Sequence, residues 1–303
     1  MPRRFATSSS SPRCVPNDGR LRPAGWSRRR SPKHPARVSE NAVSLECAAR
    51  AALATDSSRT HVFEHDGRRY VVKRLAARSR RLIQTLFMRW LVKRLSGQRL
   101  PLETLALSGA TSSMDFEATR LNDLAAAGIR VPRVALVTTE FFVLEYCGAV
   151  VQVQLKRWTQ ETWRSELPRL ATELGEFHRA GHWHGGAQIR NVTLQDGISY
   201  RIDFEEDFGE IMPLEMTQAA DLVLFLNSIP LSGPIGESEA RQLLPRLIDR
   251  YCAANPDPEI MNIIRCGLPL LKRLAALARP FRRWSKRGIP RVLIMVDVFS
   301  ARE

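Results

Sequence analysis

The sequence predicts an α+β protein with two lobes, a small β-rich lobe followed by a mainly helical one. Asp-Gly occurs twice between runs of β-forming residues, at Asp66-Gly67 and Asp196-Gly197, and this is the strongest local signal for a β-hairpin. In the second half of the chain, apolar residues recur mainly at helical spacing. The 303 residues, 44% of them hydrophobic, are enough for a large core in one or two domains.

The overall charge is strongly basic. A net charge of +15 and a pI near 10.5 favour anionic partners, such as nucleic acid, an acidic lipid surface or a phosphorylated substrate. The five cysteines are scattered and include no Cys-x-x-Cys pair, which predicts neither a disulfide framework nor a zinc site and favours a reducing cytoplasm. No apolar run approaches the roughly 20 residues that cross a bilayer. We therefore expect a cytoplasmic protein, or one that lies on a membrane face.

The first 40 residues differ from the rest of the chain. Residues 1–40 are rich in Arg, Ser and Pro and have too few apolar side chains to offset the entropy of ordering, so they predict a disordered basic arm. Such an arm could bind anionic lipid or RNA, and a start codon assigned too far upstream would look the same.

The first lobe is expected over residues 41–148. The patterns predict a helix over 41–54, a hairpin over 61–75, a helix over 115–127 that Gly128 ends, and strands over 132–137 and 140–146. Glu117 falls in the first turn of its helix, where the helix dipole favours a carboxylate. A basic helical pattern over 78–95 fits either a core-facing helix with snorkelling charges or a surface for membrane or nucleic acid.

The second lobe is expected over residues 149–303. It should contain helices over 162–180, 217–226, 237–253 and 260–277. The basic segment 268–286, which Pro280 interrupts, alternates Lys and Arg with Leu, Phe281 and Trp284. That composition favours an interfacial helix on a membrane surface, and a packing helix with a charged outer face is the alternative.

A polar stretch inside this lobe, His184 to Asp207, predicts a metal site. A loop closes at Asn191, a hairpin turns at Asp196-Gly197, and Asp203 follows the second strand. Because paired strand ends lie side by side, Asn191 and Asp203 should meet at one edge, and their oxygens suit Mg²⁺. Five carboxylates within eight residues would repel one another unless a cation is bound, and a solvated acidic turn is the alternative; they are Asp203, Glu205, Glu206, Asp207 and Glu210.

Three histidines precede this loop, at His178, His182 and His184. Neither a cysteine nor a Glu-x-x-His pair accompanies them, so we do not predict zinc. His184 is interpreted as a core histidine that braces the loop.

The order of these residues, His184, Asn191, a hairpin and then Asp203-Phe204, resembles the catalytic loop and metal-binding segment of the protein-kinase-like superfamily. The resemblance covers about residues 55–230 and implies a bilobal kinase-like fold with ATP and Mg²⁺ as cofactors. It implies that Asn191 and Asp203 hold the metal. It also implies that His184 packs beneath Asp-Phe and that Asp221 tethers the loop backbone.

In the first lobe the resemblance implies a nucleotide site. The strand pattern Val-Val-Lys makes Lys73 the nucleotide-binding lysine, with Glu117 as its ion-pair partner. The segment Leu144-Glu145-Tyr146-Cys147-Gly148 resembles the strand that leads into the hinge, where backbone groups around Glu145 would meet the adenine ring. A Gly-x-Gly-x-x-Gly loop does not precede Lys73; residues 55–60 form a polar turn instead.

The sequence departs from the family at the catalytic base. Gly186 stands at the position of the catalytic Asp, and Glu205 replaces the Gly after Asp-Phe. Gln188 could orient an acceptor hydroxyl, and Glu205 or Glu206 could act as the base. A general base contributes typically ~10² to 10⁴ in rate, and phosphoryl transfer depends mostly on positioning and charge neutralisation.

Three functions follow. The first is a kinase that transfers phosphate to a hydroxyl, most similar to the small bacterial kinases of lipopolysaccharide core or Kdo sugars, with a lipid-linked sugar or a protein as acceptor. That branch works at the inner membrane face, which suits the basic segments. The second is a pseudokinase that binds nucleotide or a partner without turnover. A nucleic-acid-binding protein ranks last, because no recognisable RNA or DNA module supports it. The sequence carries no signal of an oligomeric state.

Overall fold

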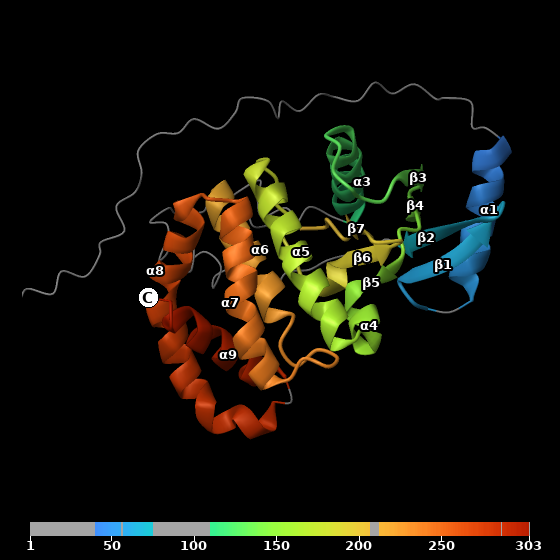
Figure 1. The fold of residues 1–303 in the computed structure, drawn as a ribbon. Coiled ribbons are helices and arrows are strands. Elements are labelled where there is room, and N and C mark those ends of the chain that lie inside the picture. Colours follow the sequence, from blue (N-terminus) through green and yellow to red (C-terminus); the bar gives the residue numbers. More distant parts are fainter. Residues whose placement is uncertain (1–39, 56, 75–109, 207–211, 286, 303) are drawn as a thin grey trace, which may run out of the picture.

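The computed structural model describes residues 40–55, 57–74, 110–206, 212–285 and 287–302. The expected basic arm, apart from its last residue, and the expected basic helix over 78–95 lie outside these ranges. The predicted α+β class is confirmed. Small antiparallel sheets are formed mainly by the first half, and the second half is mostly helical, which is consistent with a kinase-like arrangement (Figure 1).

The N-terminal part is a four-stranded antiparallel sheet in the order β1-β2-β4-β3. Its strands are β1 Thr60–His65, β2 Arg68–Arg74, β3 Val134–Val137 and β4 Phe141–Glu145. The β1–β2 turn holds Asp66 at φ 48° and Gly67 at φ 69°, the positive values that Asp-Gly tolerates, as the sequence predicted. Helix α1 (Glu40–Ala54) packs on this sheet, where Leu45, Ala49 and Leu53 bury against strand residues.

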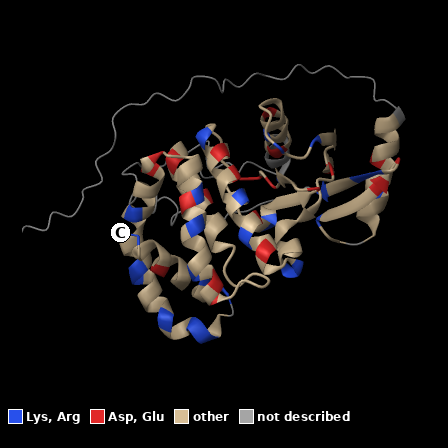
Figure 2. Cartoon of the chain, in the orientation of Figure 1, with Lys and Arg blue, Asp and Glu red and all other residues tan. Residues whose placement is uncertain are grey.

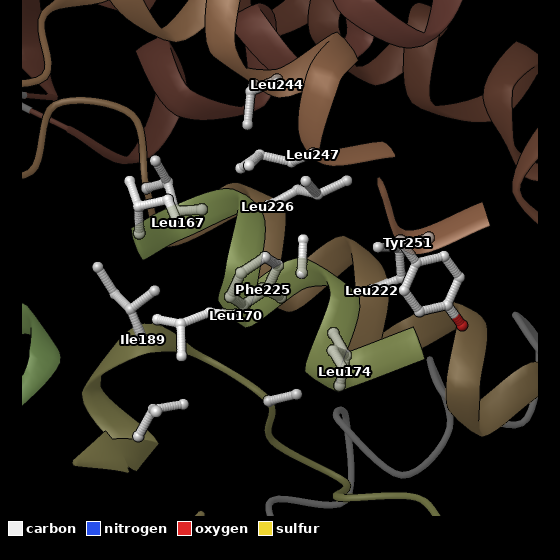
Figure 3. Close-up of a cluster of buried hydrophobic side chains, with 14 of the residues drawn as sticks. Leu167, Leu170, Leu174, Ile189, Leu222, Phe225, Leu226, Leu244, Leu247 and Tyr251 are labelled. Atoms are coloured by element: carbon white, nitrogen blue, oxygen red, sulfur yellow. The ribbon is translucent and has the colours of Figure 1, made fainter. Parts of the chain in front are cut away.

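The C-terminal part is built around α5 (Gln160–Arg179), α6 (Leu214–Asn227) and α7 (Glu237–Ala254). Figure 3 shows the leucines of α5 interlocking with Leu222, Phe225 and Leu226 of α6 and with Leu244, Leu247 and Tyr251 of α7. A Cβ on Gly175 would lie 2.7 Å from Tyr251 O, so this glycine permits the close approach of α5 and α7. The remaining elements are α8 (Pro258–Ala278), the 3₁₀ segment η5 (Arg279–Trp284) and α9 (Gly288–Ser300).

A second, three-stranded sheet lies between the two parts (Figure 1). It runs in the order β5-β6-β7, with bounds Ala149–Val150, Val192–Gln195 and Ile198–Arg201. Strand β5 leads into the short helices α4 (Val151–Gln154) and η2 (Leu155–Arg157), and η3 (Ile189–Asn191) precedes β6. The predicted hairpin over 192–202 is therefore present, and it is extended by a third strand.

The structure corrects the predicted bounds of the helix that carries Glu117. Helix α3 spans Ala110–Ala126, so it begins five residues before the expected start, and Glu117 lies in its third turn rather than its first. The helix dipole at the N-terminus of α3 therefore does not explain why a glutamate occupies position 117. Among the described residues, Cys47, Cys147 and Cys252 carry free thiols. Within the described ranges, no helix is long and apolar enough to cross a bilayer.

Candidate active site

Lys73 is the centre of the candidate site. It lies near the end of β2, and its side chain is almost completely buried. Its Nζ donates to both oxygens of Glu117, at 3.1 and 3.0 Å, and to Asp203 Oδ1 at 2.6 Å, and it also pairs with Glu205. The ion pair between Lys73 and Glu117 that the resemblance implied is thus present, and the structure adds two further carboxylates to it.

The charges of this cluster do not balance. Three carboxylates surround Lys73, and Arg59 supplies one more positive charge through its 3.0 Å ion pair with Glu205. Burial alone would lower the pKa of Lys73, but the three carboxylates outweigh it and raise that pKa. Burial also raises the pKa of Glu117 to about 7, in spite of Lys73, with Asp203 and Glu205 adding to the effect. The cluster is an environment that a bound cation would relieve.

The donor set fits a hard cation. One oxygen from each of Glu117, Asp203 and Glu205 can lie within 4.8 Å of the others, which makes this a metal-binding candidate among the described residues. Asp203 sits at φ 69°, a left-handed conformation that is uncommon outside glycine. Burial would raise its pKa, but Lys73 holds the pKa of Asp203 well below its usual range, so it stays ionised.

Asn191 and Asp203 lie at the same end of the hairpin, as expected. The backbone N–H of Ile202 donates to Asn191 O at 3.0 Å, so Asp203 follows directly after the paired residue. The side-chain Nδ2 of Asn191 donates to Gly186 O at 2.8 Å. This hydrogen bond commits the amide nitrogen to the loop, and Oδ1 is the atom that a cation would use.

His184 connects the loop to the segment after β7. Its Nε2 lies 3.0 Å from Ile202 O, and its Nδ1 accepts from the Gly186 N–H at 3.2 Å, an arrangement that fits one neutral tautomer. The His184 ring stacks on Phe204 with centroids 4.3 Å apart. Burial lowers the pKa of His184 to about 4, which keeps the ring neutral. Its position is the one expected from the resemblance.

Asp221, on α6, binds the backbone of the same loop. Its carboxylate is completely buried and accepts from the backbone N–H groups of His184, Gly185 and Ala187 at 2.6, 3.1 and 3.3 Å. Burial would raise the pKa of Asp221, but His178 and His184 lower it instead. His178 lies 2.6 Å from Tyr251 Oη through Nδ1 and 3.6 Å from Asp221 Oδ2 through Nε2, so it braces the aspartate that holds the loop.

Arg120 is a site residue that sequence reasoning missed. It lies one turn after Glu117 on α3, and its guanidinium stacks over the Trp183 ring at 3.3 Å, with the Phe204 ring 5.4 Å away. It also donates to Trp183 O. Arg120 therefore joins the helix that carries Glu117 to the loop and to Phe204. The i, i+3 spacing of Glu117 and Arg120 was visible, but nothing in the sequence placed Trp183 beside them.

Gln188, Gly186 and Glu145 form hydrogen bonds through backbone atoms. The Gln188 N–H donates to Gly186 O at 2.7 Å, and its carbonyl accepts from the Asn191 N–H at 2.8 Å. A Cβ on Gly186 would meet only Asn191 Nδ2 at 3.5 Å and His184 Nδ1 at 3.9 Å, which is ordinary contact. The N–H of Glu145 donates to Arg133 O at 2.9 Å, and the Glu145 carbonyl accepts from Cys147 Sγ at 3.4 Å.

Comparisons with known proteins found similar solved structures but no family model. No family model matches the chain, and no curated protein matches it. Among solved structures, WaaP in complex with acyl carrier protein aligns with 77% of this chain and 92% of that chain, at 18% sequence identity and a TM-score of 0.40.

Proposed function

We propose that this chain is a phosphotransferase that binds ATP with Mg²⁺ and passes a phosphoryl group to a hydroxyl. The observation that carries the proposal is the Lys73 cluster, in which one buried lysine joins Glu117 of α3 to Asp203 beside a tethered loop. ATP supplies the phosphoryl group and Mg²⁺ neutralises its charge. The carboxylates around Lys73 and the Asn191 amide oxygen are the hard ligands that such an ion prefers.

Each residue has a role in this proposal. Lys73 binds phosphate oxygens once it exchanges a carboxylate partner for them, and Glu117 holds its ammonium in place. Asp203 and Asn191 hold the metal ion. The carbonyl of Glu145, which also accepts from the Cys147 thiol, is the proposed adenine contact at the hinge, because the Glu145 N–H already donates to Arg133 O. Asp221 and His184 fix the loop that carries Gly186 and Gln188.

The acceptor follows from the sequence resemblance. Similarity to the lipopolysaccharide-core kinases makes a lipid-linked sugar hydroxyl the first acceptor to test, and a protein hydroxyl the second. We place the protein in the cytoplasm, peripheral on the inner membrane face.

The alternative function, that of a pseudokinase, is supported by Gly186. No carboxylate stands at the family's base position, and Gln188 cannot accept a proton at neutral pH. Glu205 is turned toward Lys73 and Arg59, so in this state it is not placed to serve as the base.

Substitution of Gly186 separates the two functions. Gly186→Asp should fit without distortion, since an added Cβ meets only ordinary contacts. If the chain is a slow kinase, Gly186→Asp should raise the rate of ADP formation by about 10² or more, within the usual contribution of a general base. Gly186→Asn, which has the same shape and no basic oxygen, should not. Absence of ADP from the wild type and both variants, with nucleotide binding retained, would leave the pseudokinase.

A further inference from the structure

The outer surface of the α8–η5 junction is unusually apolar. Leu274, Leu277, Phe281 and Trp284 are 44%, 72%, 49% and 84% exposed. Their spacing of three, four and three residues places them along one stripe, and the Phe281 and Trp284 rings meet edge to face at 5.6 Å. On the opposite side of α8, Leu268 and Ala275 are buried in the core. The helix therefore presents apolar side chains in both directions, where a surface helix normally turns a polar face to water.

Positive charge surrounds this stripe. Residues 260–296 contain nine Lys and Arg and no Asp or Glu. Figure 2 shows blue residues gathered along the lower part of α8 and the turn that follows it. The neighbouring carboxylates are Glu237, which pairs with Arg282 at 2.5 Å, and Asp297, which pairs with Arg279 at 3.5 Å. Arginines 273, 283 and 287 are also exposed, so the surface stays positive after these pairs are counted.

We propose that this apolar stripe and its arginines form a docking surface for an anionic phospholipid bilayer. The surface offers hydrocarbon and cations, which are the two groups that a bilayer with acidic headgroups complements without a matching shape. Trp284 is the side chain best suited to the boundary, because indole has an apolar body and one N–H donor. The proposal is independent of catalysis and holds equally for a kinase and a pseudokinase.

Vesicle flotation of the full chain tests this proposal. Vesicles of phosphatidylcholine alone are compared with vesicles that also contain phosphatidylglycerol. Two double variants alter the surface, Leu277→Ser with Trp284→Ser and Arg273→Glu with Arg283→Glu. Two controls alter exposed residues elsewhere, Val62→Ser on β1 and Arg250→Glu on α7. All five proteins should unfold at similar temperatures, because the altered side chains face water.

The wild type and both controls should float with the anionic vesicles, and added salt should weaken their binding. Each double variant should bind at least about tenfold more weakly. Absence of flotation in the wild type would overturn the proposal. So would unchanged binding of both double variants, which would place the contact elsewhere in the chain, or loss of RNA binding in these variants with vesicle binding intact, which would make this a nucleic-acid surface.

Discussion

Lys73 is held by more carboxylates than a lysine–glutamate pair requires. The sequence resemblance implied Glu117 as the partner of Lys73, and in the structure both Glu117 and Asp203 contact Lys73. Glu205 and Arg59 extend the cluster, and the sequence did not indicate them as partners of Lys73, because they meet only when β1, β2 and the segment after β7 fold together. A phosphate group must therefore compete with buried carboxylates for Lys73, unless a cation neutralises them first.

The neutral ring of His184 predicts a dependence of stability on pH. The folded-state pKa is about 4 and the unfolded value about 6.5, so the unfolded chain takes up the proton first as the pH falls. The contribution of His184 to stability is complete above pH 6.5 and is lost between pH 6.5 and 4. Between pH 7.5 and 5, this one group should lower the free energy of unfolding by about 2 kcal/mol.

Urea denaturation of wild type and His184→Gln at pH 7.5 and 5 measures this term. The variant should lose about 2 kcal/mol less than the wild type over that interval, whatever its stability at pH 7.5. Equal losses of unfolding free energy in wild type and His184→Gln would contradict the prediction. They would show that the His184 ring takes up its proton in the folded state at the same pH as in the unfolded chain.

At the scale of elements, most of the fold was predictable because its signals are local. Periodic leucines defined α5, α7 and α8, and Asp-Gly defined both hairpins. The start of α3 was missed because Ala110 to Met114 is rich in Ser and Thr, which usually favour helix ends. Strand β5 has two residues, too few for any periodic pattern, and it forms by pairing with β6.

Gly148 fixes the junction between the first sheet and β5. It has φ +94°, and a Cβ there would lie 2.4 Å from Leu194 O in β6. Gly128 also has a positive φ, +77°, but nothing lies within 4 Å of its Cβ position. Gly128→Ala should therefore cost about 1 to 2 kcal/mol for backbone conformation alone, and Gly148→Ala about 3 kcal/mol or more because the clash is added.

Chemical denaturation of the two alanine variants separates backbone strain from steric clash. Gly148→Ala should also weaken nucleotide binding, since it moves the hinge against β6, whereas Gly128→Ala should not. Equal destabilisation by the two substitutions would mean that β5 shifts freely and that the hinge is not fixed by this contact.

On the scale of the whole molecule, the candidate site exists only where distant segments meet. Lys73 comes from the N-terminal sheet, Glu117 from α3, and Asp203 and Glu205 from the segment after the central hairpin (Figure 1). The order of the motifs in the sequence was sufficient to predict Lys73, Glu117 and Asp203 as site residues. It could not predict Arg120 or Arg59, whose contacts depend on how α3 and β1 lie against the loop segments.

The most direct test of the account is a thermal-shift titration with ATP, with and without Mg²⁺. It compares the wild type with Asp203→Asn and with Asp123→Asn, an exposed aspartate of α3 that serves as the matched control. Ligand at 100 times its dissociation constant should add about 2.7 kcal/mol to stability. We expect a Mg²⁺-dependent shift in the wild type and in Asp123→Asn that is lost in Asp203→Asn. No shift in the wild type, or a shift that Asp203→Asn retains in full, would contradict a nucleotide–metal site at Lys73 and Asp203.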